Sequence, residues 1–128
     1  MNSTPPPPPP KPRNFLTHPK AYGQYADVHW NPDMDAAHPD AATAARWQHR
    51  IAVQTRVALQ MREVTQEDFA RQMGREKQYL ADRINGHRWM SLPDAAFLAN
   101  HLGVHVVQPE VSPRRVPVDR RTPPRPRA

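Results

Sequence analysis

"TQEDFARQMGREKQYLADRING", residues 65–86, contains two short helical patterns separated by a glycine. Thr65 followed three residues later by Asp68 is typical of a helix N-terminus, where the hydroxyl accepts a backbone N–H. Gly74 stands where the first helix would end, because glycine readily adopts the left-handed conformation that closes helices. The second pattern runs over residues 76–85 and is followed by Gly86. This stretch therefore predicts two short helices joined by a tight turn.

A longer helix is predicted ahead of this pair. Residues 40–64, "DAATAARWQHRIAVQTRVALQMREV", contain neither glycine nor proline, and either Asp40 or Thr43 can cap the start. Apolar residues recur there at steps of three or four, the spacing of one helix face. The inward face predicted from this spacing comprises Trp47, Ile51, Val57, Ala58 and Met61.

A further helix is predicted over "SLPDAAFLANHLG", residues 91–103. Ser91 is the expected cap, Asp94 occupies the capping-box position and Gly103 marks the end. The inward stripe predicted from helical spacing comprises Leu92, Ala95, Leu98, Ala99 and Leu102.

Both ends of the chain differ in composition from this helical centre. The 128 residues include 17 prolines, six of them consecutive near the start, and no cysteine. Proline runs favour polyproline II and form no core, and the mean hydropathy of -0.86 is low. We expect a Pro-rich, mostly irregular leader over 1–40, an all-α domain of four to five helices over 41–107, and a disordered Arg/Pro-rich tail over 108–128.

Charge is distributed unevenly along these parts. The net charge is +6, and it divides into -1 over residues 1–45, +3 over residues 46–107 and +4 over the tail. A positive domain and tail suit a polyanionic partner. The chain has no apolar run near the roughly 18 residues needed to span a bilayer and no signal-peptide pattern, so we expect a cytoplasmic, nucleoid-associated protein with no membrane partner.

The predicted helix over residues 76–85 separates apolar and polar side chains onto opposite sides. At 3.6 residues per turn, Leu80 and Ile84 lie about 40° apart and define its buried face. Gln78, Asp82 and Asn85 lie opposite, within about 60°. In a DNA major groove, amide and carboxylate side chains of this kind pair with the edges of bases.

The whole run over residues 65–104 resembles the lambda-repressor/Cro type of helix-turn-helix, the XRE family. The matching features are the Thr-Gln start, the following acidic pair, the central glycine, Asn-Gly after the second helix and the final Leu-Gly-Val. The residues that carry them are Thr65-Gln66, Glu67-Asp68, Gly74, Asn85-Gly86 and Leu102-Gly103-Val104. The resemblance implies a DNA-binding fold whose second helix is the recognition helix. Glu76 departs from the pattern, because the family usually has a small capping residue there.

Base-reading and phosphate-binding residues follow from the resemblance together with the helix geometry. Lys77 can donate to guanine, Gln78 can pair with adenine, and Asp82 can accept from cytosine or instead pair with Arg83 or Lys77 and read nothing. Gln66 and Asn85 fall on the family's backbone-positioning sites. Further phosphate candidates, chosen for charge and position, are Arg75, Arg83, His87 and Arg88.

Other chemistry finds little support in the sequence, and we expect no cofactor, no metal site and no enzymatic activity. His101 and His105 are four apart, but Gly103 interrupts the helix between them and no acidic third ligand is evident. Phe97 falls partly outward on its helix. It is expected either to pack beneath residues 22–30 or to belong to a homodimer interface.

The function predicted is that of a sequence-specific regulator of transcription that binds double-stranded DNA, acting as a repressor in a bacterium or phage. One alternative is the antitoxin of a toxin–antitoxin pair, with DNA binding and a toxin partner. A second alternative is a protein-interaction adaptor that uses the polyproline leader and does not bind DNA.

Overall fold

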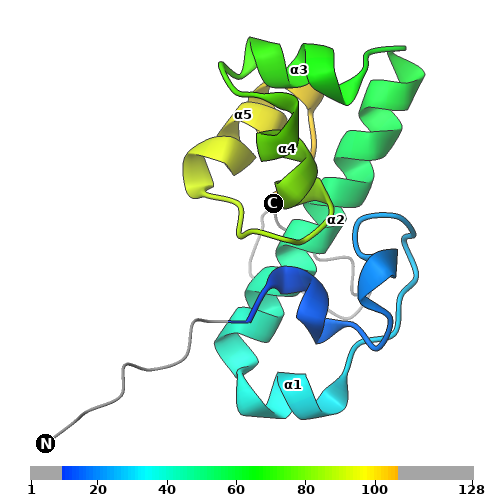
Figure 1. Cartoon of the computed structure of the whole chain (residues 1–128), viewed down its shortest axis with the longest axis vertical. Helices are drawn as coiled ribbons and strands as arrows, with labels where there is room; N and C mark the ends of the chain where they lie inside the picture. Colours follow the sequence, from blue (N-terminus) through cyan, green and yellow to red (C-terminus); the bar gives the residue numbers. More distant parts are fainter. Residues whose placement is uncertain (1–9, 107–128) are drawn as a thin grey trace, which may run out of the picture.

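The computed structural model describes residues 10–106, which form five α-helices preceded by two 3-10 turns (Figure 1). Within this range the regular pairing of strands is limited to one isolated bridge between Leu16 and Trp30. The fold is therefore all-α, as predicted. The expected polyproline leader before residue 10 and the expected basic tail after residue 107 lie outside the described residues. The elements are η1 (Pro12–Phe15), η2 (Pro19–Ala21), α1 (Pro32–Ala37), α2 (Pro39–Met61), α3 (Gln66–Gln72), α4 (Lys77–Ile84) and α5 (Leu92–Leu102).

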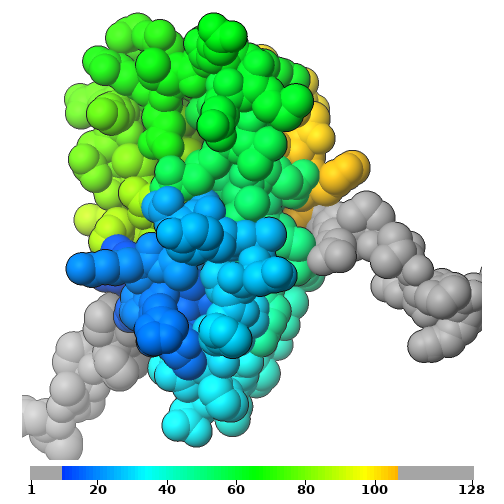
Figure 2. Space-filling model, turned by 90° about the vertical axis from the view of Figure 1, so that its right-hand side faces the viewer, coloured from blue at the N-terminus to red at the C-terminus, as the bar shows by residue number. Residues whose placement is uncertain are grey.

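The long helix α2 is shared by two packed groups (Figure 1). Helices α4 and α5 pack against α2, and α3 packs against α4. We call α3, α4 and α5 the α3–α5 bundle. The N-terminal segment, residues 10–38, packs against the other half of α2 and includes both 3-10 turns and α1. Figure 2 shows this segment, in blue and cyan, directly below the green helices.

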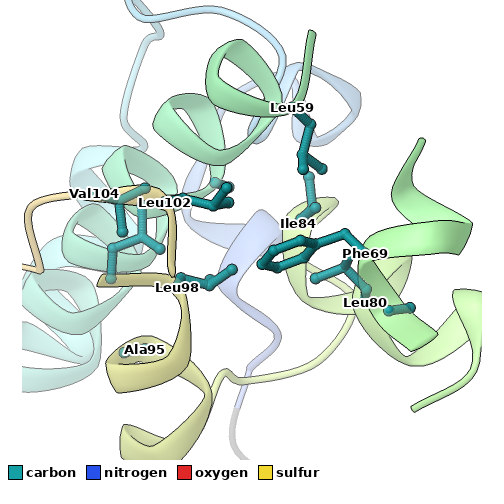
Figure 3. Close-up of a cluster of buried hydrophobic side chains, with 11 residues drawn as sticks. Leu59, Phe69, Leu80, Ile84, Ala95, Leu98, Leu102 and Val104 are labelled. Carbon is teal, nitrogen blue, oxygen red and sulfur yellow. The ribbon is translucent and has the colours of Figure 1, made fainter. Parts of the chain in front are cut away.

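The α3–α5 bundle encloses an aliphatic core with one aromatic ring (Figure 3). Leu80, Ile84 and Leu98 are each at most 1% exposed, and Phe69 packs among them. The other members of this cluster are Ile51, Ala52, Leu59, Ala70, Ala95, Leu102 and Val104. Burying these side chains is the main stabilisation of the bundle, because a fully buried leucine or phenylalanine contributes about 1.5–3 kcal/mol relative to an exposed one.

The buried face of α2 differs from the predicted one. Of the five predicted residues only Ile51 is buried, while Trp47, Val57 and Met61 are 41%, 49% and 79% exposed. The helix instead buries small and polar side chains: Ala42, Ala45, Gln48, His49, Ala52 and Thr55, with Leu59 near its end. The prediction was wrong because it ranked large apolar residues as inward, whereas the N-terminal segment approaches α2 closely enough to require small ones.

The ends of α2 also differ from expectation. The N-cap is His38, which makes no side-chain cap hydrogen bond, and Pro39 occupies the first turn. Neither Asp40 nor Thr43 caps the helix; the Thr43 hydroxyl donates to the Pro39 carbonyl inside the first turn. The helix ends at Met61, three residues earlier than predicted, and Glu63 adopts a left-handed φ of 57° in the connection to α3.

The predicted caps of α3 and α5 are confirmed. The Thr65 hydroxyl accepts the Asp68 N–H at 3.0 Å, and Ser91 and Asp94 form a reciprocal capping box. Gly103 ends α5 with a φ of 72°. The inward stripe of α5 is confirmed at Ala95, Leu98 and Leu102, with Ala99 half-buried. Leu92 was predicted wrongly: it is 81% exposed, because the first residue of the helix projects beyond the packed face.

The N-terminal segment meets the end of α4 with almost no space between them. A Cβ at Gly23 would overlap the Ile84 carbonyl oxygen, and a Cβ at Gly86 would lie 2.5 Å from the Tyr22 ring. Both glycines have φ above 70°, which L side chains rarely adopt. Tyr22 is 1% exposed and its hydroxyl donates to the Ala45 carbonyl at 2.6 Å. Residues 10–40, predicted as a mostly irregular leader, thus contribute packed structure against α2 and α4.

Candidate nucleic-acid interface

Helix α4 presents one polar face to solvent because its other face is buried in the bundle. Leu80 and Ile84 are 1% and 0% exposed, as predicted. Lys77 and Gln78 are exposed, and Asp82 is half-buried. The turn before α4 sets this orientation: Gly74 has a φ of 74°, and the Arg75 N–H donates back to the Ala70 carbonyl at 2.9 Å. The glycine is needed here for its conformation alone, since a Cβ at Gly74 would meet no neighbour within 4 Å.

Gln78 and Asp82 form a pair on this face. The Gln78 side-chain amide donates to Asp82 Oδ1 at 2.7 Å. Asp82 forms no salt bridge with Arg83 or Lys77 within residues 10–106, so neither pairing expected as an alternative is found. One amide hydrogen and the carbonyl oxygen of Gln78, together with the second carboxylate oxygen of Asp82, have no hydrogen-bond partner among residues 10–106.

Two arginines stack on the ring of Tyr79 at one edge of the face. The Arg83 and Arg75 guanidinium carbons lie 3.6 and 4.3 Å from the ring centroid. The Tyr79 hydroxyl donates to Asp94 Oδ2 at 2.7 Å, which ties α4 to the start of α5. This hydrogen bond, with burial, raises the pKa of Tyr79, so the phenol keeps its proton. Stacking reduces the freedom of both guanidinium groups without neutralising their charge.

Asn85 and Gln66, the two predicted positioning residues, lie in different surroundings. Asn85 is half-buried at the end of α4, and its side-chain oxygen accepts from Arg56 and, at 3.4 Å, from Gln24. Gln66 begins α3 and lines a hollow that Gln24 and Arg56 also line. The sequence analysis did not identify Arg56. The contact joins residues 29 positions apart, and nothing in the pattern of α2 indicates that Arg56 lies beside Asn85.

The loop after α4 is held by Gln48, a residue that sequence reasoning also missed. Its side-chain amide donates to the Arg83 and Arg88 carbonyls at 2.9 and 3.0 Å, and its oxygen accepts from Met90 N–H at 2.7 Å. Gln48 is 4% exposed. It thereby fixes the backbone of three positions around the predicted phosphate-binding residues. A buried glutamine in a helix gives no sequence signal of its partners.

His87 contacts the N-terminal segment. The Arg13 guanidinium lies within hydrogen-bonding distance of the His87 ring nitrogens. Burial lowers the pKa of His87, and the neighbouring charges of Arg13 and Lys11 lower it further, whereas Asp82 opposes them. His87 is therefore neutral near pH 7 and serves as the acceptor for Arg13.

The predicted residues partly converge on a single hollow beside α4, with a volume of about 700 Å³. Its lining includes five of them: Gln78, Asp82, Arg83, His87 and Arg88. The other four lie outside this lining: Lys77 and Arg75 at the amino-terminal side of α4, Gln66 on α3, and Asn85 at the end of α4. The lining of the hollow thus combines an amide and a carboxylate group with cationic side chains.

Phe97 lies against α3. Its ring packs edge-on to Phe69 at 5.6 Å and stacks on His101 at 3.9 Å. It is half-buried and packs against the core of the α3–α5 bundle, whereas Trp30 packs on the separate cluster of Phe15, Ala42 and Ala45. The expected packing beneath residues 22–30 is therefore not found, and the dimer contact stays a prediction.

Comparison with protein-family models, with curated proteins and with solved structures finds no significant match for this chain. Within residues 10–106 no group of three or more His, Asp or Glu side chains is placed to hold a metal ion. In the same range no helix combines the length and the apolar character needed to cross a membrane. The site is therefore interpreted from its own geometry.

Proposed function

We propose that the protein binds double-stranded DNA in a sequence-specific manner and regulates transcription, with α3 and α4 acting as a lambda-repressor-like helix-turn-helix. One observation carries the proposal: α4 is anchored by Leu80 and Ile84, and its outer face carries the exposed Lys77 and Gln78 beside the half-buried Asp82. A helix of this width fits the major groove, where each base pair displays a distinct pattern of donors and acceptors.

The roles proposed for this face follow from its hydrogen-bonding groups. Lys77 donates to guanine O6 or N7. Gln78 and Asp82 act as one unit, because the hydrogen bond between them orients the amide. The free amide hydrogen and carbonyl oxygen of Gln78 can then pair with N7 and N6 of adenine, and Asp82 can accept from cytosine N4. Each good contact contributes about 1–3 kcal/mol of discrimination.

The surrounding cations are proposed to hold the phosphate backbone. Arg75 and Arg83, oriented by Tyr79, lie on one edge of α4, and Arg88 lies beyond its end. Gln66 and Asn85 supply uncharged donors. A protein seated in this way over a promoter would repress transcription by excluding polymerase. Because such proteins commonly bind two half-sites one DNA turn apart, we further propose a homodimer on DNA.

Selection of bound duplexes from a random pool, repeated at low and high salt, tests this proposal. The expected result is a defined motif that persists at the higher salt concentration. A palindromic motif with half-sites about 10 base pairs apart would support the dimer. Binding that declines steadily with salt and selects no motif would overturn sequence-specific recognition.

Two substitutions test the division of roles. Gln78→Ala should relax the motif at one position of each half-site, with a loss of about 1–3 kcal/mol for the preferred base. Arg88→Ala should weaken all duplexes about equally and leave the motif unchanged. If Gln78→Ala instead lowers binding uniformly, Gln78 does not read bases.

A further inference from the structure

Lys11 lies at the same hollow as five of the predicted DNA-binding residues, although it is 67 positions before Gln78, the first of them in the chain. The hollow of about 700 Å³ beside α4 is lined by Lys11 and Trp89 in addition to the α4 and loop residues. The sequence placed Lys11 in an irregular leader, remote from the helix-turn-helix. The structure brings the leader's first described residues to the carboxyl end of α4.

The backbone around Lys11 is held in place on both sides. The Trp89 indole N–H donates to the Pro10 carbonyl at 3.0 Å, and the Asn14 N–H donates to the Lys11 carbonyl at 3.0 Å. Two residues later, the Arg13 N–H donates to the Gly86 carbonyl at 3.1 Å. Pro12 is fully buried between these contacts. Lys11 is thus presented from a fixed backbone, which lowers the entropy cost of using it in binding.

The charge of the hollow favours an anion. Lys11, Arg83 and Arg88 contribute three positive charges, and none of them forms a salt bridge within residues 10–106. Asp82 is the acidic residue of the lining, and one of its oxygens already accepts from Gln78. Arg13 is occupied by His87 and acts as a positioning residue for the loop.

We propose that this hollow binds the phosphate backbone of the DNA where it passes the carboxyl end of α4, with Lys11 as a phosphate ligand supplied by the N-terminal segment. The proposal rests on the proposed function and extends its surface to residues before α2. Lys11 comes from the N-terminal segment and Arg88 from the loop after α4. The site is therefore complete only when residues 10–16 are packed against that loop.

The test measures how the affinity of the full chain for DNA depends on salt. Neutralising one phosphate contact changes the slope of log K against log salt by about 0.9 on duplex DNA. Lys11→Ala should therefore reduce the slope by about 0.9, so that the loss of affinity between about 50 and 200 mM salt becomes about 3.5-fold smaller. The selected motif should not change, because a phosphate contact carries no base information.

Lys20→Ala is the matched control, because Lys20 is an exposed lysine of the same segment outside the lining of the hollow. It should leave the slope unchanged, and Lys11→Arg should restore it. Equal slopes for Lys11→Ala and Lys20→Ala would overturn the inference. Circular dichroism of each variant shows whether the fold is retained.

The outcome separates this inference from the proposed function when slopes are measured on both selected and random duplexes. If the wild-type protein selects a motif and Lys11→Ala leaves the salt slope unchanged, only the role of Lys11 is refuted. If the wild-type protein selects no motif but Lys11→Ala reduces the salt slope, sequence-specific reading is refuted and the phosphate site is supported. Absence of binding to either duplex refutes both.

Discussion

The two groups that pack on α2 are held together in different ways. The α3–α5 bundle is an aliphatic cluster in which Leu80, Ile84 and Leu98 are almost fully buried. The N-terminal segment has a much smaller cluster around Phe15, Ala42 and Ala45. Its contact with the rest of the protein combines the buried rings of Phe15 and Tyr22 with buried hydrogen bonds and with glycines that allow close approach. Aliphatic packing dominates the first group, whereas the second adds individual polar groups and close backbone fit to a few buried rings.

The difference matters for the proposed site because the two groups meet at the end of α4. The outer face of α4 depends on the bundle, and the loop that follows depends on contacts with α2 and the N-terminal segment. Gln48 bonds this loop from α2, and His49 accepts the Gly23 N–H at 3.0 Å from the segment. Comparisons of core, polar and titratable residues can break or sharpen this contrast.

The largest effect is expected for Leu98→Ala, which opens a cavity in the aliphatic cluster. Substitutions of this kind cost about 2–5 kcal/mol. The free energy of unfolding, measured by urea titration followed with circular dichroism, should fall by about 3 kcal/mol.

Phe15→Ala should instead increase amide hydrogen exchange mainly in residues 10–38. If both variants raise exchange equally throughout, the two groups form one cooperative unit and the contrast fails.

A smaller effect is expected for Gln48→Ala. The substitution leaves the Arg83 and Arg88 carbonyls and the Met90 N–H without their partner, and should cost about 2 kcal/mol. Gln54→Ala is the control, because Gln54 also bonds backbone groups, those of His105, but at an exposed site. It should cost less than about 1 kcal/mol. Similar losses in urea titrations would show that burial of the Gln48 bonds is unimportant.

The smallest effect is expected from pH, through His49. Burial lowers the pKa of His49 below its ordinary value of 6.5, against opposing contributions from the Tyr25 and Ala26 carbonyls, while the Arg50 charge lowers it further. As the pH falls below 6.5 the unfolded chain therefore takes up a proton before the folded protein does. The free energy of unfolding should decrease through this range and be independent of His49 well above it.

His49→Asn tests this assignment, because the asparagine oxygen can still accept the Gly23 N–H but does not titrate. The variant should show a shallower fall in stability below pH 6.5 than the wild type, when melting temperatures are compared across pH. Some dependence of the melting temperature on pH should remain because of His87, whose pKa is also lowered. If His49→Asn and the wild type lose stability equally below pH 6.5, the effect comes from other histidines.

Local patterns predicted the elements that depend on local physics. Thr65, Ser91 and Gly103 mark helix ends because capping is decided by neighbouring backbone groups. The spacing of Leu80 and Ile84 correctly predicted the buried face of α4. The same use of spacing predicted the wrong buried face for α2, because Trp47, Val57 and Met61 are exposed. Which face of a helix is buried depends on what packs against it, and α2 packs against two partners.

The sequence by itself determined an all-α chain, the caps of α3 and α5, and the amphipathic α4 that presents Lys77, Gln78 and Asp82. These features follow from interactions within about four residues along the chain. Only the tertiary structure decided that Gln48 holds the loop after α4 and that Lys11 reaches the hollow beside it. Such contacts join residues 35 or more positions apart, and their partners are set by the packing of whole segments rather than by any local pattern.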